Sequence, residues 1–431
     1  MRLDAGNVIA PHVTPGLSRA ELAELDERVR TAAGRIEEGR ADGEPGYVTL
    51  NLPDMADVGE IQDALEQLPD PERVVIAGIG GSALGAATLV EALGSSSRLH
   101  VMDNVDPAAT RDLIERVDLA ETVVHAVSRS GRTTETLANV SVIAEAMRTA
   151  GVDPWSRMLV TTGAEGPLRT LADEKDLPAL SVPAGVPGRY AALSTVGLPA
   201  VGLLGHDMAA VLEGGRRAVD ALSPSLFDCA PYGFGAISYG LATQGATVHA
   251  MMPYGERLEA FAEWFAQLWA ESLGKDGTGQ IPGRALGVTD QHSQLQLYRA
   301  GPPVVQTSFL VVRELSGASV PNNPDLKIVP ELAGIDLSDL LVAEQRATEA
   351  SLAASGRPNI RLEIDRLDAR SIGELLVSIE ASCMMAGELF EINPFDQPAV
   401  EWAKRAIRGK LSGEKTAETR VVEGKTERRI G

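Results

Sequence analysis

The chain has 431 residues, 44% of them hydrophobic and 23% charged, which is typical of a globular protein long enough to bury a sizeable core. Its formal net charge of -21 argues against general binding to nucleic acids or anionic membranes, because both partners carry charge of the same sign. No apolar run reaches the ~18 residues that a membrane span requires, and the first residues lack a signal-peptide pattern. The two cysteines show no metal or disulfide spacing. We therefore expect a cytoplasmic protein.

Residues 1–55 are expected to form an N-terminal helical arm. Leu22, Leu25 and Val29 recur at helical spacing, and Ser18 is a candidate N-cap because a glutamate follows three residues later. The pattern predicts a charged helix with one apolar stripe.

Residues 56–205 alternate strand-like and helix-like stretches. Strands are expected in RVVIAGIG at 73–80, LHVMD at 99–103, ETVVHAVS at 121–128 and MLVTT at 158–162, with helical patterns between them. This alternation predicts a first domain with a parallel sheet and helices on both faces.

Residues 206–395 begin a second alternation. Strands are expected in GATVHAMM at 245–252, SFLVVREL at 308–315 and LKIV at 326–329, and a long helix is expected at 256–273. The fold class is therefore α/β, with two doubly wound domains whose parallel-rich sheets are flanked by helices.

The last segment, 396–431, is expected to contain a short helix and then a charged tail. From residue 405 onward, charges alternate with almost no apolar periodicity, which favours a frayed tail or an arm.

The motif GIGGSA at 78–83 follows a strand and opens a helix. Glycines let the backbone approach a ligand, and a helix N-terminus offers free N–H groups to an anion. The same letters fit the GxGxxA fingerprint of dinucleotide binding, with Asp103 ending the next strand about 20 residues on. A phosphate site, a nicotinamide dehydrogenase and a tight turn without a ligand all stay open at this point.

The motif SRSGRTTET at 128–136 has the same strand-to-helix context. Hydroxyl groups, two guanidiniums and a helix N-terminus converge within one turn, which suits a phosphate monoester. A dinucleotide site has no need of this second anion cradle. The alternative is an N-cap cluster with exposed arginines.

Four further residues are candidates for chemistry. Arg189 lies in a Pro/Gly-rich loop, Glu271 near the end of a helix, His292 in the polar segment DQHSQ, and Lys404 after a turn. Three of them have an ordinary alternative: a salt bridge for Arg189, an exposed Glu–Lys pair with Lys275 for Glu271, and a surface lysine for Lys404. A histidine in a polar setting such as that of His292 is a candidate acid or base. No metal-ligand spacing such as HExxH appears, so no metal is expected.

Together and in this order, the segments GIGGS, SRSGRTTET, PGRY, QLWAESLGK, DQHSQ and NPFDQPAVEWAK resemble the glucose-6-phosphate isomerase family over most of residues 72–404. ESLGK and DQHS are the most specific. The resemblance implies two sugar-isomerase domains, a homodimer, and neither metal nor nucleotide cofactor. It implies reversible isomerisation of glucose 6-phosphate to fructose 6-phosphate through a cis-enediolate, and it leaves open a side activity on mannose 6-phosphate.

The resemblance also implies roles for individual residues. Glu271 is the expected base and Arg189 the group that stabilises the enediolate. His292, from the partner subunit, and Lys404 are expected to open the sugar ring. Arg132 departs from the family, which commonly has Thr there. The residues expected to bind the sugar or its phosphate are Gly81, Ser82, Ser128, Arg129, Ser130, Thr133, Gln267 and Gln397.

Two rival classes follow from the same residues. The dehydrogenase would use GIGGSA with Asp103. A sugar-phosphate-sensing protein without catalysis would not need Glu271, His292 and Lys404 together.

Overall fold

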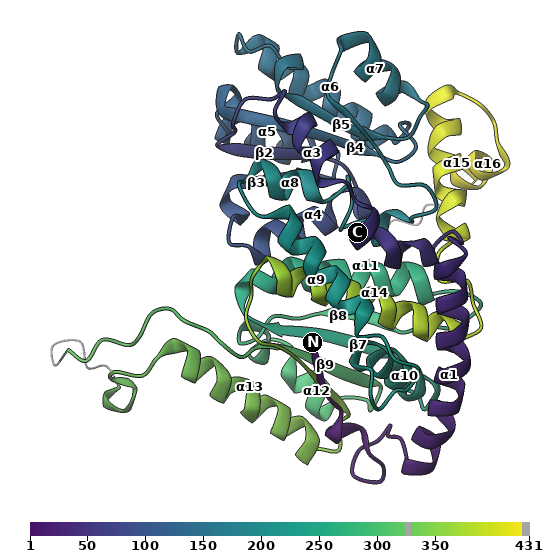
Figure 1. The fold of residues 1–431 in the computed structure, drawn as a ribbon, viewed down its shortest axis with the longest axis vertical. Coiled ribbons are helices and arrows are strands. Elements are labelled where there is room, and N and C mark those ends of the chain that lie inside the picture. The colour runs from purple at the N-terminus through teal and green to yellow at the C-terminus, as the bar shows by residue number, and fades with distance from the viewer. Residues whose placement is uncertain (324–328, 425–431) are drawn as a thin grey trace.

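The computed structural model describes residues 1–323 and 329–424, and within them the chain forms two five-stranded sheets. The two sheets lie one above the other along the long axis, with α-helices between and around them (Figure 1). The predicted α/β class with parallel-rich sheets is confirmed.

The first sheet is entirely parallel, with the strand order β3-β2-β4-β5-β6. In chain order this is 2-1-3-4-5, so the connections leave β2 and β4 toward opposite sides of the sheet. That reversal is a topological switch point, where α/β proteins bind ligands at the carboxyl ends of the strands. The strands are β2 (Arg73–Ala77), β3 (Leu99–Met102), β4 (Thr122–Ser128), β5 (Met158–Thr162) and β6 (Ala179–Ser181).

Helices connect and cover the first sheet. Pro167 at the first position of α7 suits a helix start, because the missing N–H would have no partner there. The helices of this region are α2 (Leu52–Met55), α3 (Val58–Leu65), α4 (Leu84–Ala92), α5 (Pro107–Arg116), α6 (Thr134–Thr149), α7 (Pro167–Lys175) and α8 (Leu198–Leu203).

The second sheet has the order β1-β10-β9-β7-β8, and its parallel strands repeat the 2-1-3-4 arrangement of the first. Its edge strand β1 runs antiparallel to β10 and comes from the N-terminal segment, for which we predicted only a helical arm. Three residues are too few to show a strand period in the sequence. The strands are β1 (Arg2–Asp4), β7 (Val248–Tyr254), β8 (Ile281–Arg284), β9 (Val305–Val312) and β10 (Asn359–Ile364).

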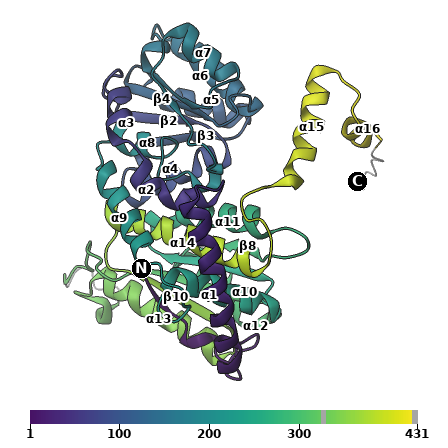
Figure 2. The same ribbon diagram turned by 45° about the vertical axis from the view of Figure 1, so that its right-hand side comes forward.

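Helix α1 (Arg19–Ala41) begins with the predicted capping box. The Ser18 hydroxyl accepts the backbone N–H of Glu21, and the Glu21 carboxylate accepts the backbone N–H of Ser18. Leu22, Leu25 and Val29 are buried as expected. The helix lies along the outside of the body, beside the half that contains the second sheet (Figure 2).

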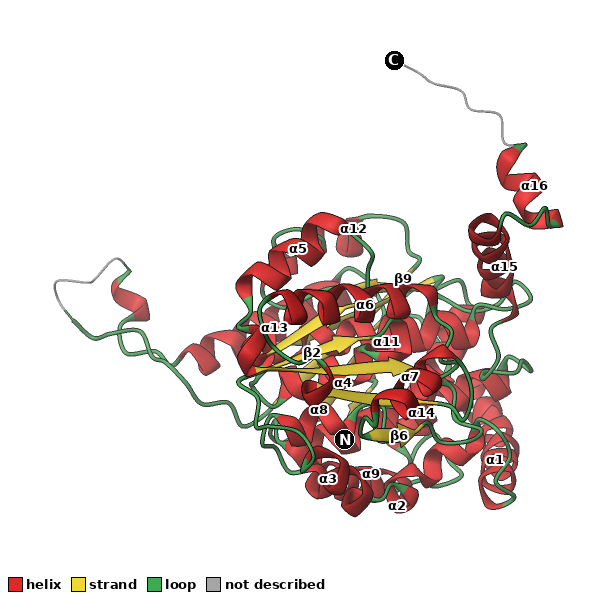
Figure 3. Ribbon diagram, turned by 90° about the horizontal axis from the view of Figure 1, so that it is seen from above, coloured by secondary structure: helices red, strands yellow, loops and turns green. Residues whose placement is uncertain are grey.

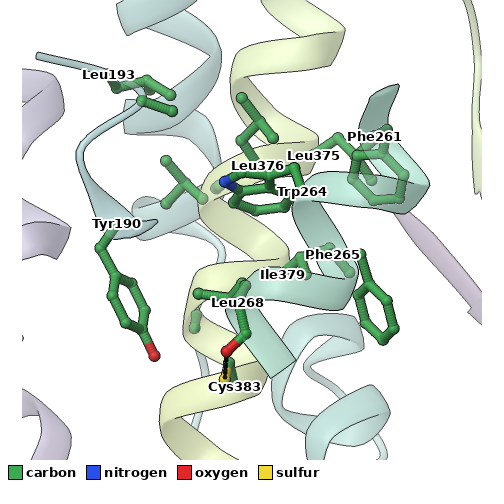
Figure 4. Close-up of a cluster of buried hydrophobic side chains, with 14 of the residues drawn as sticks. Tyr190, Leu193, Phe261, Trp264, Phe265, Leu268, Leu375, Leu376, Ile379 and Cys383 are labelled. Carbon is green, nitrogen blue, oxygen red and sulfur yellow. Dashed lines mark hydrogen bonds between the residues drawn. The ribbon is translucent and has the colours of Figure 1, made fainter. Parts of the chain in front are cut away.

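A layer of helices joins the two sheets, and α14 is buried along nearly its whole length. Figure 4 shows Trp264 of α11 beside Leu375 and Leu376 of α14. This packing fixes the helix that carries the candidate base. The helices between residues 206 and 389 are α9 (Met208–Asp220), α10 (Ala230–Thr243), α11 (Glu259–Leu273), α12 (Leu295–Ala300), α13 (Leu337–Ala354) and α14 (Ala369–Leu389).

The short helix predicted in the C-terminal segment is present as α15 (Pro398–Ser412). It continues past residue 405, where a frayed tail or an arm was expected, and with α16 (Ala417–Glu423) it forms a helical hairpin that projects from the body (Figures 2 and 3). Ile407 and Leu411 lie one helical turn apart, and the surrounding charges concealed this short apolar pattern.

The strand expected at 326–329 falls almost wholly outside the described residues. None of the helices in the described ranges combines the length and apolarity needed to cross a bilayer.

Close helix contact depends on two glycines. A Cβ on Gly373 of α14 would lie 2.0 Å from the carbonyl oxygen of Val211, and a Cβ on Gly214 of α9 would lie 1.9 Å from that of Arg370. No heavy side chain fits at these distances, so α9 and α14 pack backbone against backbone.

Substituting Gly373 by Ala should therefore lower the free energy of unfolding by about 1–3 kcal/mol, because the methyl group forces the helices apart. Gly34 of α1 is the matched control, since a Cβ there meets no atom within 4 Å. Gly34→Ala should raise stability by roughly 0.5–1 kcal/mol through helix propensity. Urea unfolding of both variants tests this pair, and equal signs would contradict the packing argument.

Candidate active site

A cleft of about 600 Å³ opens at the carboxyl ends of β2 and β4, bounded by α11 and by α15. It lies at the switch point of the first sheet. Of the residues expected to act in catalysis or to bind the sugar or its phosphate, all but Ser128 and His292 line it. The predicted residues that line it are Gly81, Ser82, Arg129, Ser130, Thr133, Arg189, Gln267, Glu271, Gln397 and Lys404.

The turn after β2 meets the loop that carries Arg189. A Cβ on Gly81 would lie 2.3 Å from the carbonyl carbon of Gly188 and 2.4 Å from the backbone nitrogen of Arg189. Only glycine permits this approach. The backbone carbonyl of Arg189 also accepts the indole N–H of Trp264 at 3.2 Å. The loop is thus held between the glycine turn and α11.

The loop after β4 presents Arg129, Ser130 and Thr133 to the cleft. Ser128 lies behind them: its side chain is buried, and its hydroxyl is 2.9 Å from that of Thr133. The side chain of Arg132, which departs from the family pattern, is exposed and does not line the cleft. Hydroxyl groups, one cation and the N-terminus of α6 therefore face the cleft, a set that suits an anion.

Arg189 is 3% exposed, and two edges of its guanidinium are fixed to the protein. Its Nε donates to the Ser272 hydroxyl at 2.8 Å. Its Nη2 donates to the backbone carbonyls of Pro394 at 2.7 Å and Asp396 at 3.1 Å. The buried guanidinium thus connects the loop that carries Arg189 to the end of α11 and to the segment before α15.

The third edge faces the cleft. Nη1 of Arg189 donates to Oε2 of Glu271 at 3.2 Å and to Oε1 of Gln397 at 3.4 Å. The other carboxylate oxygen of Glu271 accepts from the Gln267 amide at 3.1 Å, one turn earlier on α11. The carboxylate is thereby oriented on both sides, while the Glu271 side chain stays 31% exposed to the cleft. All five N–H donors of Arg189 have acceptors.

The Glu–Lys pair considered for Glu271 is not formed. Helix α11 ends at Leu273, so Lys275 leaves the helical face. Its ammonium group pairs with Oδ1 of Asp396 at 3.0 Å instead. The Glu271 carboxylate therefore accepts hydrogen bonds from Arg189 and Gln267 and not from Lys275.

The remaining candidates lie at the edge of the cleft or away from it. Lys404 of α15 lines the cleft and pairs with Glu401 at 2.7 Å. His292 is exposed at the end of the 3-10 turn Thr289–Gln291 and does not line the cleft of its own chain. Asp103, on which the dehydrogenase alternative depended, does not line it either.

Sequence reasoning missed the buried support of Arg189. Ser272 is fully buried, and its hydroxyl is 3.1 Å from that of Tyr190, whose pKa burial raises above its usual value. The available signal was position: Ser272 directly follows the candidate base, and Tyr190 directly follows the arginine.

The fold and the cleft define an α/β enzyme with two sheets, whose site combines an anion-binding loop with a carboxylate oriented by a buried guanidinium. Residues 69–423 match the phosphoglucose isomerase family. A protein of Haloarcula marismortui named probable glucose-6-phosphate isomerase is 53% identical over 100% of this chain and 99% of its own length. The glucose-6-phosphate isomerase of Rubrobacter xylanophilus is 39% identical over 93% of this chain and 95% of its own length. The chain belongs to the phosphoglucose isomerase family.

Two solved structures share this fold. A Thermus thermophilus protein, solved as a hypothetical protein, has a TM-score of 0.85 at 34% identity, covering 95% of this chain and 99% of that chain. A glucose-6-phosphate isomerase of Chlamydia trachomatis has a TM-score of 0.80 at 23% identity, covering 94% and 89%, which shows the shared fold. The family resemblance drawn from the sequence is confirmed, and the dehydrogenase and sensor alternatives are set aside.

Substituting Arg189 by Lys should lower the free energy of unfolding by about 1–3 kcal/mol, because an ammonium group cannot satisfy buried acceptors on three sides. Arg216→Lys is the control, since this half-exposed arginine pairs with the exposed Asp54, at 2.8 Å. It should change stability by less than about 0.5 kcal/mol. Urea unfolding compares the two, and equal losses would show that the five-donor arrangement contributes nothing.

Proposed function

We propose that the chain interconverts glucose 6-phosphate and fructose 6-phosphate through a cis-enediolate, with Glu271 as the base. The observation that carries this assignment is the Glu271 carboxylate, held between Arg189 and Gln267 in a cleft that also contains an anion-binding loop. A positioned carboxylate next to a cation is what proton abstraction beside a carbonyl requires.

The phosphate group binds to the loop after β4. Ser130 and Thr133 supply hydroxyls, Arg129 supplies a cation, and α6 supplies the N–H groups of its first turn. Ser128 supports this loop from behind through its contact with Thr133. Binding the phosphate, which does not react, orients the reacting end of the sugar near Glu271.

The reaction begins with opening of the sugar ring. A proton leaves the C1 hydroxyl and another reaches the ring oxygen, work that we assign to His292 and Lys404. Glu271 then removes the C2 proton, and the electron pair forms the enediolate. Return of that proton to C1 and transfer of the O2 proton to O1 give the ketose. One carboxylate on one face of the intermediate suffices for both transfers.

Arg189 stabilises the enediolate through Nη1. Its Nε and Nη2 are held by Ser272 and by backbone carbonyls, whereas its Nη1 contacts are the longest, at 3.2 and 3.4 Å. Nη1 is therefore the edge that exchanges a protein acceptor for a substrate oxygen. Because the other edges are fixed, the charge needs little reorganisation when the oxyanion forms.

We also propose that the chain acts in the cytoplasm as a homodimer in which His292 reaches the cleft of the partner subunit. Within one chain, His292 is exposed and lies outside the cleft. The hairpin of α15 and α16 projects from the body (Figure 2). It exposes apolar side chains that a second copy would cover. These side chains are Trp402, Ile407, Leu411, Val421 and Val422.

The test of function is proton NMR of chelator-treated protein with fructose 6-phosphate in D₂O, without nucleotide. We expect glucose 6-phosphate carrying deuterium at C2. Glu271→Gln should slow its formation by about 10²–10⁴-fold while substrate binding survives, because the amide cannot accept the proton. A signal from mannose 6-phosphate would add the side activity at C2.

The control for this variant is Glu263→Gln. Glu263 lies on α11 as well, but its half-exposed carboxylate pairs with Arg284 at 2.6 Å. It should retain the wild-type rate. A near-normal rate for Glu271→Gln would remove Glu271 from the mechanism, and an inactive wild-type chain would refute the proposed function.

Mixed dimers test the origin of His292. Glu271→Gln and His292→Ala homodimers should each be nearly inactive. If His292 crosses the interface, each mixed dimer contains one intact site, so random subunit exchange should restore about a quarter of wild-type activity. If both groups come from one chain, every site keeps a defect and mixing restores nothing.

A further inference from the structure

Residues 393–397, called the strap here, link α14 to α15, and each has a specific anchor. The backbone carbonyl of Asn393 accepts the Lys275 ammonium group, and its side-chain oxygen accepts the backbone N–H of Phe395 at 2.9 Å. Pro394 packs so tightly on Gly387 that a Cβ there would lie 2.7 Å from the proline ring.

An aromatic contact holds the middle of the strap. The Phe395 ring lies edge-to-face with Tyr47 at 4.7 Å and with Tyr190 at 5.6 Å between centroids. A Cβ on Gly46 would lie 2.1 Å from the Phe395 ring, at a backbone φ of 93°. The ring therefore fills a site shaped for it.

Two cationic side chains, Arg189 and Lys275, bind Asp396. Its backbone carbonyl accepts Nη2 of Arg189 at 3.1 Å, and its carboxylate pairs with Lys275 at 3.0 Å. Lys275 is 11% exposed and also donates to the carbonyl of Ser272 at 3.1 Å, at the end of α11. Burial lowers the pKa of Lys275, and the Asp396 carboxylate opposes that shift.

The strap sets the position of the groups that follow it. Gln397, its last residue, contacts Arg189, and Lys404 lies within the first two turns of α15. Figure 2 shows α15 standing apart from both domains. The location of Lys404 over the cleft therefore depends on where the strap begins that helix.

We propose that Lys275 and Asp396 are positioning residues for the isomerisation. Their ion pair fixes the strap to the end of α11. Lys404 of α15 and Glu271 of α11 can then both contact the same bound sugar. This inference rests on the proposed function, since the step it affects is the ring opening assigned to Lys404. Misplacement by about 1 Å is enough to cost up to 10²-fold in rate.

The test compares a cyclic and an acyclic substrate in Lys275→Met and Asp396→Asn. The acyclic substrate is an aldose 6-phosphate with hydrogen in place of the C4 and C5 hydroxyls, so that no ring forms. With glucose 6-phosphate, kcat/KM should fall by about 10–100-fold. With the acyclic substrate, C2 proton exchange in D₂O should fall by less than about twofold, because ring opening is bypassed.

The ratio of the two losses does not depend on how much of a preparation is folded. A merely structural role would lower both rates by the same factor, and that result would overturn the proposal. Asp396→Asn keeps the comparison available if Lys275→Met fails to fold, since the Asp396 side chain is 53% exposed. Glu271→Gln, in contrast, should lose activity with both substrates.

A double-mutant cycle supplies the second readout. If the ion pair is the functional unit, the double variant with both Lys275→Met and Asp396→Asn should lose about as much kcat/KM with glucose 6-phosphate as either single variant. Losses that multiply would contradict a shared role. Asp54→Asn, which breaks the exposed pair with Arg216, should behave as wild type. An inactive wild-type chain would refute the proposed function, whereas wild-type rates in the variants would refute this inference alone.

Discussion

The buried guanidinium of Arg189 is the interaction on which the site depends. A charge that is 3% exposed is costly to bury unless its hydrogen-bonding groups are paired, and here all five donors have acceptors. Those acceptors come from the end of α11 and from the segment before α15. The need to pair one cation therefore brings together three parts of the chain that are far apart in sequence.

The helix layer between the sheets makes this arrangement rigid. Helix α11 carries Gln267, Glu271 and Ser272 on its last two turns, while its aromatic residues pack on α14 (Figure 4). Glycine contacts hold α14 against α9 without intervening side chains. Because well-packed interiors resist small displacements, the carboxylate and the guanidinium stay in register with the loop after β4 on the neighbouring sheet.

Much of the cleft was predictable because its parts are local. The glycine turn after β2 and the hydroxyl-rich loop after β4 each follow a strand and open a helix, and parallel strands bring such loops to the same edge of a sheet. The capping box of α1 is likewise a pattern within four residues. In these cases the sequence spacing alone contains the geometry.

The parts that escaped prediction depend on distant partners. Lys275 stands four residues after Glu271, a spacing that indicates a helical pair, yet α11 ends between them and Asp396 becomes its partner. Strand β1 exists only because β10 offers an edge. No local pattern encodes such contacts.

The strongly acidic chain still has to attract a dianionic sugar phosphate. Arg189 contributes little net positive charge, because Glu271 lies 3.2 Å from it, and Lys404 is paired with Glu401. Arg129 forms no ion pair with any described residue and faces the cleft beside the N-terminus of α6. The attraction is therefore concentrated at the phosphate loop, where cation and helix N–H groups act within a few ångströms. The reacting end, in contrast, is close to neutral before reaction, so the donors there respond chiefly to the charge that develops on the enediolate.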